Sequence, residues 1–143
     1  MYMACSPVFV LSTVALLFPT GLVSERKAPM AFISDHRDRL VGSNILLSDN
    51  HLAHSVALDT GRRDLLILGD PSEFDNGLGH PDEEARLVSL EAFRELIGQS
   101  ERAEVVAVLD QAGMQRALGS GVPVPDQRMD GSRLVIATWN AQP

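Results

Sequence analysis

The chain has 143 residues, a formal net charge of −7 and a hydrophobic fraction of 45%. This length suits one domain with at most a short appendage. The acidic balance argues against nucleic acid as a partner, because phosphate binding requires a basic patch. The single cysteine, Cys5, excludes an intrachain disulfide.

The first predicted element is an N-terminal transmembrane helix over residues 1–24. Residues 4–23 contain no charged side chain, and about 20 such residues form a helix roughly 30 Å long, the thickness of a bilayer core. One alternative is a signal peptide, but the segment lacks a basic start and a clean A-x-A cleavage site. The other alternative is a helix buried in the protein core. We expect the membrane span, followed by a linker helix over residues 25–43 with apolar residues at helical spacing.

The remaining residues, 44–143, are predicted to form a soluble α/β domain. Short apolar runs rich in Val, Ile and Leu indicate strands that are buried on both faces. These strands are expected at residues 44–49, 64–70, 104–110 and 133–139. Helical spacing predicts helices between them at residues 50–60, 89–98 and 110–119, and residues 120–131 form a Pro/Gly loop. Strands that alternate with helices predict a small, mainly parallel sheet of about four strands with flanking helices.

Residue types at the expected helix ends support these boundaries. Asp49 or Asn50 can cap the start of the first helix, and Gly61 can end it. Ser89 is a favourable N-cap for the second helix, with Val88 and Phe93 at the two positions of a hydrophobic staple.

A metal site is the first chemical candidate. Asp49, His51 and His54 lie close together in the sequence, His80 is a further candidate ligand, and the two histidines three residues apart share one helix face. However, the stretch lacks an H-E-x-x-H pattern, and histidines beside Asn and Ala are common on protein surfaces. We therefore expect solvent-facing or capping histidines, with no metal and no cofactor.

Other patterns for catalysis are weak. The sequence has no G-x-S-x-G nucleophile motif, and its Gly-rich stretches match neither a Walker nor a dinucleotide fingerprint. Ser48, Asp70 and Asp110 stand near strand ends, where α/β sheets usually bind ligands. That argument depends on fold analogy alone, so we expect no independent enzyme.

One loop has two interpretations. It contains the candidate site residues Glu73, Gly77, Gly79, His80, Pro81, Asp82 and Arg86. The first interpretation is turn chemistry, because the glycines permit positive φ and the proline stiffens the end of the loop. The second is a surface loop that faces a substrate or a partner. The residue types alone favour the turn.

The order of these elements resembles the C-terminal end of the bacterial aminoarabinose (4-amino-4-deoxy-L-arabinose) lipid A transferases. The matching residues are Arg63-Asp64, Glu73, Gly77-Leu78, Pro81-Asp82, Arg86, Val88 and Phe93. Members of this family are polytopic glycosyltransferases of the GT-C type with a small periplasmic domain after the last membrane span. The departures are Ser72, Phe74, Asn76 and His80, where the family has Gly, Leu and two tyrosines.

The resemblance implies a function for the parent protein, which is the transfer of aminoarabinose from undecaprenyl phosphate to lipid A and hence polymyxin resistance. It also implies that the catalytic region lies outside this chain, which is then non-catalytic by itself. The expected location is the inner membrane with the soluble part in the periplasm, although Arg26 and Lys27 after the span would favour the cytoplasm.

The partners implied by the resemblance are the membrane domain of the parent transferase and the lipid bilayer, with lipid A or the undecaprenyl-phosphate sugar as further candidates. The alternative is a membrane-anchored α/β binding or interaction module without enzymatic activity.

Overall fold

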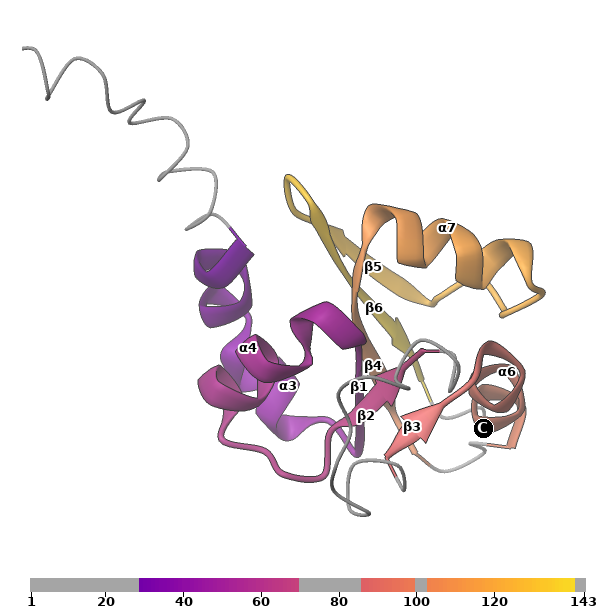
Figure 1. The fold of residues 1–143 in the computed structure, drawn as a ribbon, viewed down its shortest axis with the longest axis horizontal. Helices are drawn as coiled ribbons and strands as arrows, with labels where there is room; N and C mark the ends of the chain where they lie inside the picture. Colours follow the sequence, from indigo (N-terminus) through magenta and orange to yellow (C-terminus); the bar gives the residue numbers. More distant parts are fainter. Residues whose placement is uncertain (1–28, 70–85, 100–102, 141–143) are drawn as a thin grey trace, which may run out of the picture.

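In the computed structural model, which describes residues 29–69, 86–99 and 103–140, a mixed sheet separates two layers of helices (Figure 1). The strands are β1 (Ile45–Asp49), β2 (Leu66–Leu68), β3 (Leu87–Val88), β4 (Val105–Asp110), β5 (Gln127–Asp130) and β6 (Leu134–Trp139). The helices are residues 29–35, α3 (Arg37–Gly42), α4 (Asn50–Thr60), α6 (Leu90–Gln99) and α7 (Gln111–Gly119). The strand order across the sheet is β3-β2-β1-β4-β6-β5.

The predicted α/β class is confirmed, but the number of strands is not. β1 pairs in parallel with β2 and β4, and β2 pairs in parallel with β3. β6 runs antiparallel to both β4 and β5, so the last predicted strand closes a mixed sheet of six strands. The prediction of about four strands was wrong because β3 has only two residues and β5 is a polar, largely exposed strand at the sheet edge.

Strands are added to the sheet on both sides of β1. From β1 the chain adds β2 and β3 on one side, and it then returns through α6 to place β4 on the other side of β1. The carboxyl ends of β1 and β4 therefore lie next to each other. Such a topological switch point is where open α/β sheets usually bind ligands.

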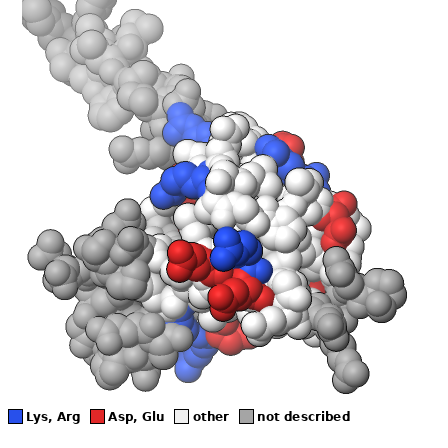
Figure 2. Space-filling model, turned by 90° about the vertical axis from the view of Figure 1, so that its right-hand side faces the viewer, with Lys and Arg blue, Asp and Glu red and all other residues white. Residues whose placement is uncertain are grey.

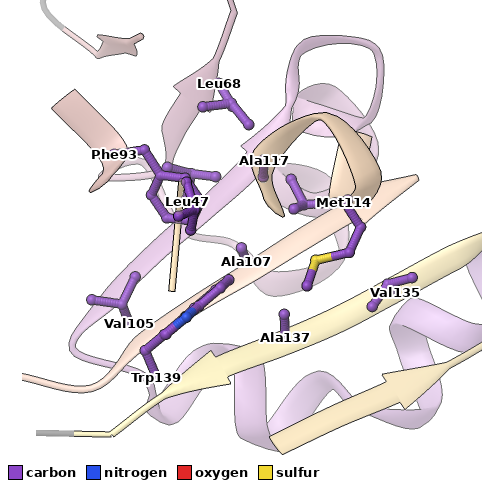
Figure 3. Packing of buried hydrophobic residues seen from close by; sticks show 12 residues of the cluster. Leu47, Leu68, Phe93, Val105, Ala107, Met114, Ala117, Val135, Ala137 and Trp139 are labelled. Atoms are coloured by element: carbon purple, nitrogen blue, oxygen red, sulfur yellow. The ribbon is translucent and has the colours of Figure 1, made fainter. Parts of the chain in front are cut away.

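The core on the α6 and α7 side of the sheet contains the largest aromatic residues (Figure 3). The ring of Phe93, which is fully buried, meets the ring of Trp139 edge to face at 5.3 Å between centroids. Trp139 Nε1 donates a hydrogen bond of 2.8 Å to the carbonyl of Pro123. This contact satisfies the indole N–H and fastens the loop before β5 to the core.

The core on the other side of the sheet includes the helices before β1. Ile33 and Leu40 are fully buried in the same cluster as Leu46 and Val56. Asp59 of α4 accepts hydrogen bonds from this N-terminal segment, from Ser34 Oγ to its side chain and from Arg37 Nε to its carbonyl. The expected linker helix is thus two helices with a turn at His36, and both pack against the sheet. The proposed domain limits stay a prediction.

The predicted helix ends agree with the structure at two places. Gly61 has a φ of 71° and its N–H donates to the carbonyl of Ala57, so it ends α4 as expected. Ser89 Oγ accepts a hydrogen bond from the N–H of Ala92, so it caps α6. Asp49 occupies the N-cap position of α4, but its side chain makes no capping hydrogen bond.

The predicted membrane span, residues 1–24, lies outside the described residues and stays a prediction. Within the part of the chain that the structure describes, no helix has the length and apolar character needed to cross a bilayer.

Candidate functional site

A cavity of about 580 Å³ opens at the carboxyl ends of the parallel strands. Its walls come from the ends of β1 and β2, from the first turns of α4 and α6, and from α7, with Asp49, His51, Gly69, Ser89, Glu91 and Arg116 among the lining residues. The volume lies within the range of small-molecule sites, about 300–1,000 Å³. The cavity therefore lies beside the switch point of the sheet, at the end of β1.

Asp49 is the most buried ionisable residue of the cavity, with an exposed fraction of 3%. Its Oδ2 accepts a hydrogen bond of 2.7 Å from the backbone N–H of Asp110, so the carboxylate joins the ends of β1 and β4. Burial raises the pKa of Asp49 above its ordinary value, and the negative charge of Asp110 adds to this rise, whereas the Asp110 N–H opposes it.

Asp110 and His51 complete a cluster around Asp49. Asp110 is the N-cap of α7, where its Oδ1 accepts a hydrogen bond from the N–H of Gly113. Its other oxygen, Oδ2, lies 3.5 Å from Nε2 of His51 in the first turn of α4. Asp49, His51 and Asp110 each offer one ligand atom, and these three atoms lie within 4.8 Å of one another.

Gly113 allows α7 to approach Asp49. A Cβ atom at this position would lie 2.9 Å from Asp49 Oδ1 and closer still to Oδ2. An isolated glycine inside a helical pattern, here in the first turn of α7, is a sequence signal of close packing.

The residues that cluster in the structure differ from the metal-ligand candidates that the sequence suggested. Asp49 and His51 meet as expected, but His54 is exposed and does not belong to the cluster. Asp110, which we had singled out only as a strand-end residue, takes its place. His80 and Asp70 lie outside the described residues. Ser48 is buried and donates to the carbonyl of Asp49, which is a structural role.

Arg86 is the only described residue of the predicted substrate-facing loop. Glu73, Gly77, Gly79, His80, Pro81 and Asp82 lie outside the described residues. Arg86 is half-buried and donates a hydrogen bond of 3.0 Å from Nη1 to the carbonyl of Arg63. Both residues precede their strands, so this bond lies at the amino ends of β2 and β3, away from the cavity at the carboxyl ends.

Charges of both signs share the face that includes α6 and α7. Figure 2 shows Lys or Arg side chains in direct contact with Asp or Glu side chains at the centre of this face. Glu91, Arg94 and Glu95 on α6 and Arg116 on α7 are exposed residues of these two helices. Neighbouring charges of opposite sign largely cancel at longer range, so this face lacks the single-sign field that attracts a polyanion.

The comparisons with known proteins agree on one family. The model described as "Arabinosyl transferase ArnT, C-terminal domain" matches residues 24–138. A curated relative from Erwinia tasmaniensis, named undecaprenyl phosphate-alpha-4-amino-4-deoxy-L-arabinose arabinosyl transferase, is 28% identical over 123 residues, covering 85% of this chain and 22% of that protein. A protein of the same name from Yersinia pestis is 27% identical over 141 residues, covering 98% and 25%. The chain thus spans about a quarter of the length of the curated relatives it matches.

Proposed function

The chain belongs to the family of C-terminal domains of the arabinosyl transferase ArnT, and from this membership we propose that it serves a membrane glycosyltransferase that transfers aminoarabinose from undecaprenyl phosphate to lipid A. The observation that supports the proposal is the family match over residues 24–138 together with relatives named as arabinosyl transferases. On this proposal the domain lies on the periplasmic side of the inner membrane and assists chemistry performed by the membrane domain.

The described residues suggest how the domain assists. Gly69, which lines the cavity, directly precedes residues 70–85, and Arg86 directly follows them. Two hydrogen bonds join the strands at these ends, from the N–H of Ile67 to the carbonyl of Arg86 and from the N–H of Gly69 to the carbonyl of Val88. We propose that this anchored segment faces the acceptor lipid or the catalytic loops, because loops on a rigid scaffold commonly provide binding residues.

The test is lipid A modification in the bacterium from which the chain comes. An in-frame deletion of the codons for residues 24–138 is expected to remove aminoarabinose-substituted lipid A from the mass spectrum, and the wild-type gene is expected to restore it. Immunoblotting in the membrane fraction separates loss of function from loss of protein. Unchanged lipid A in the deletion strain would overturn the proposal.

Substitutions then separate a substrate-facing loop from a structural connection. Asp82→Ala is expected to reduce lipid A modification at an unchanged protein level if the loop faces substrate. Arg128→Ala is the matched control, because Arg128 is exposed on the edge strand β5, where its side chain contacts only Asp130 and, through a hydrogen bond of 3.3 Å, Gln111 among the described contacts. Equal modification in both strains would leave the loop as a connection between strands.

A second candidate is a membrane-anchored α/β binding module without enzymatic activity. The cavity favours this candidate, because its volume of about 580 Å³ would suit a small ligand of the domain itself. The deletion experiment distinguishes the two, since a binding module has no effect on lipid A. A continuous reading frame upstream of Met1 that encodes further membrane spans would favour the transferase.

A further inference from the structure

We propose that Asp49, His51 and Asp110 form a binding site for one divalent transition-metal ion of the zinc type at the carboxyl edge of the sheet. Neither the family match nor the named relatives assign a metal to these residues. The inference goes beyond the proposed function and does not depend on it, because metal binding is measured on the purified chain without any transfer reaction.

The spacing of the ligand atoms fits an ion. Zinc binds imidazole nitrogen and carboxylate oxygen at about 2.0–2.2 Å, so two ligands of a tetrahedral ion lie roughly 3.4 Å apart. His51 Nε2 and Asp110 Oδ2 are 3.5 Å apart, which is long for a hydrogen bond between these atoms, normally about 2.7–3.2 Å. All three ligand atoms lie within 4.8 Å of one another, so a small shift of the exposed His51 completes the site.

The state of the Asp49 side chain is a second, independent observation. Asp49 is only 3% exposed and lines the cavity. Its Oδ2 accepts the Asp110 N–H, whereas no residue in the described ranges donates a hydrogen bond to its Oδ1. Oδ1 is not among the fully buried atoms that lack a partner, so it is open to the cavity that Asp49 lines. A cation in the cavity would supply a partner for this oxygen.

The neighbours of the two carboxylates orient them toward the same point. Asp49 does not cap its own helix α4 but turns toward β4. Asp110 is held by the N–H of Gly113 on Oδ1, which leaves Oδ2 directed toward His51. Gly113 also has no Cβ that would displace the Asp49 carboxylate. Such supporting contacts fix the direction of ligands in metal sites.

The charge balance favours a cation over an anion. The carboxylates of Asp49 and Glu91 line the cavity with Arg116, the one guanidinium among the described lining residues, and a third carboxylate, Asp110, lies beside the lining residue His51. This leaves two uncompensated negative charges, the charge that one divalent ion neutralises. The N-termini of α4, α6 and α7 and Arg116 would attract an anion, but an anion there would lie against two carboxylates. The experiment below includes this rival.

The first test uses the full chain in detergent, free of affinity tags and stripped of metal with EDTA. Calorimetric titration with Zn²⁺ alone is expected to show one ion bound per chain, together with a rise in Tm, and Mg²⁺ and Ca²⁺ are expected to bind far more weakly. His51→Gln should lower the Zn²⁺ affinity at least tenfold. His54→Gln is the matched control, because His54 is exposed on the same helix outside the cluster, and it should bind like the wild type.

The outcomes decide between a metal site, a chance interaction and an anion site. Absence of Zn²⁺ binding, or equal loss of affinity in His51→Gln and His54→Gln, would overturn the proposal. Arg116→Gln should leave Zn²⁺ affinity unchanged or higher, because it removes a like charge. If Arg116→Gln instead abolishes binding of inorganic phosphate to a chain that does not bind Zn²⁺, the cavity is an anion site. The visible spectrum of the Co²⁺ form gives a readout of ligand geometry that a merely structural role of His51 would not change.

Discussion

Replacing Arg62 with alanine is expected to destabilise the domain by about 2–4 kcal/mol. The guanidinium is largely buried, with a side-chain exposure of 12%. Its Nη1 donates to the carbonyl of Ser43 at 2.6 Å, to Ser43 Oγ at 3.0 Å and to the carbonyl of Leu40 at 3.3 Å. These acceptors belong to the C-terminal end of α3 and the residue that follows it, where a cation also interacts favourably with the helix dipole. One arginine thus fixes α3 to the start of β1.

The magnitude follows from the kind of contact that is lost. A hydrogen bond to a charged group contributes roughly 1.5–3 kcal/mol, and the short bond to Ser43 is in this class. The longer bond to Leu40 adds less, and the ion pair with Asp64 adds at most about 1 kcal/mol because that carboxylate is 66% exposed. Arg62→Lys keeps the charge but not the several directed donors, so its cost is expected to lie between zero and that of alanine.

Thermal unfolding followed by circular dichroism measures the effect. For a domain of about 100 residues, a loss of 2–4 kcal/mol lowers Tm by roughly 10–20 °C. Asp64→Ala is the control, because it removes the ion pair and leaves the bonds to Ser43 and Leu40 in place. If Arg62→Ala lowers Tm no more than Asp64→Ala does, the backbone contacts contribute nothing and the reasoning is refuted.

Four further outcomes are expected. Phe93→Ala should cost about 3–5 kcal/mol because the ring is fully buried, as measured by urea unfolding followed through the single tryptophan; a cost under about 1 kcal/mol would contradict the core assignment. Thr138→Val should raise stability by about 0.5–1 kcal/mol in the same assay, since the buried Thr138 hydroxyl has no hydrogen-bond partner among the described residues, and a loss of stability would show that it has one. Gly113→Ala should lower stability by about 1–3 kcal/mol although alanine favours helices, because its Cβ would overlap a buried carboxylate; a gain would mean that the carboxylate moves freely. The hydrogen bond from Arg62 holds the pKa of Asp64 below its ordinary value, so the stability due to this carboxylate is present above about pH 4 and is lost as the pH falls through the lowered pKa. The Tm difference between wild type and Asp64→Asn should therefore shrink on acidification. A Tm difference that grows on acidification would contradict this prediction.

The elements that could be predicted are those whose signal is local. The strands β1, β4 and β6 are apolar because both of their faces are buried, and burial on both faces produces a continuous hydrophobic run. β2 has the same apolar composition, although two of its three residues are half-buried. β5 has no such run, because it lies at the sheet edge and exposes most of its side chains. It forms through backbone hydrogen bonds to β6, and such bonds do not require particular side chains, so the sequence does not indicate them. The loop predicted there was wrong for this reason.

The candidate site could be predicted residue by residue but not as a cluster. Asp49, His51 and Asp110 were each candidate residues in the sequence. Helical spacing, however, predicted that His51 lies next to His54, because spacing within a helix was the only distance that the sequence provided. The hydrogen bond between Asp49 and Asp110 spans 61 positions. It exists because β4 lies next to β1 rather than beyond β3, and hydrophobic patterns do not specify that choice of neighbour.

The motif residues that carry the sequence resemblance and the residues that line the cavity are different sets. Arg63 accepts a hydrogen bond from Arg86, Asp64 pairs with Arg62, and Phe93 fills the core. The matched residues among those described therefore maintain the fold, while the cavity is built from Asp49 and its neighbours. A substitution in the first set should change the free energy of unfolding, and one in the second should change binding with a smaller effect on stability. It follows that the motif residues are evidence for the scaffold, and that a ligand of the cavity must be established from the cavity residues themselves.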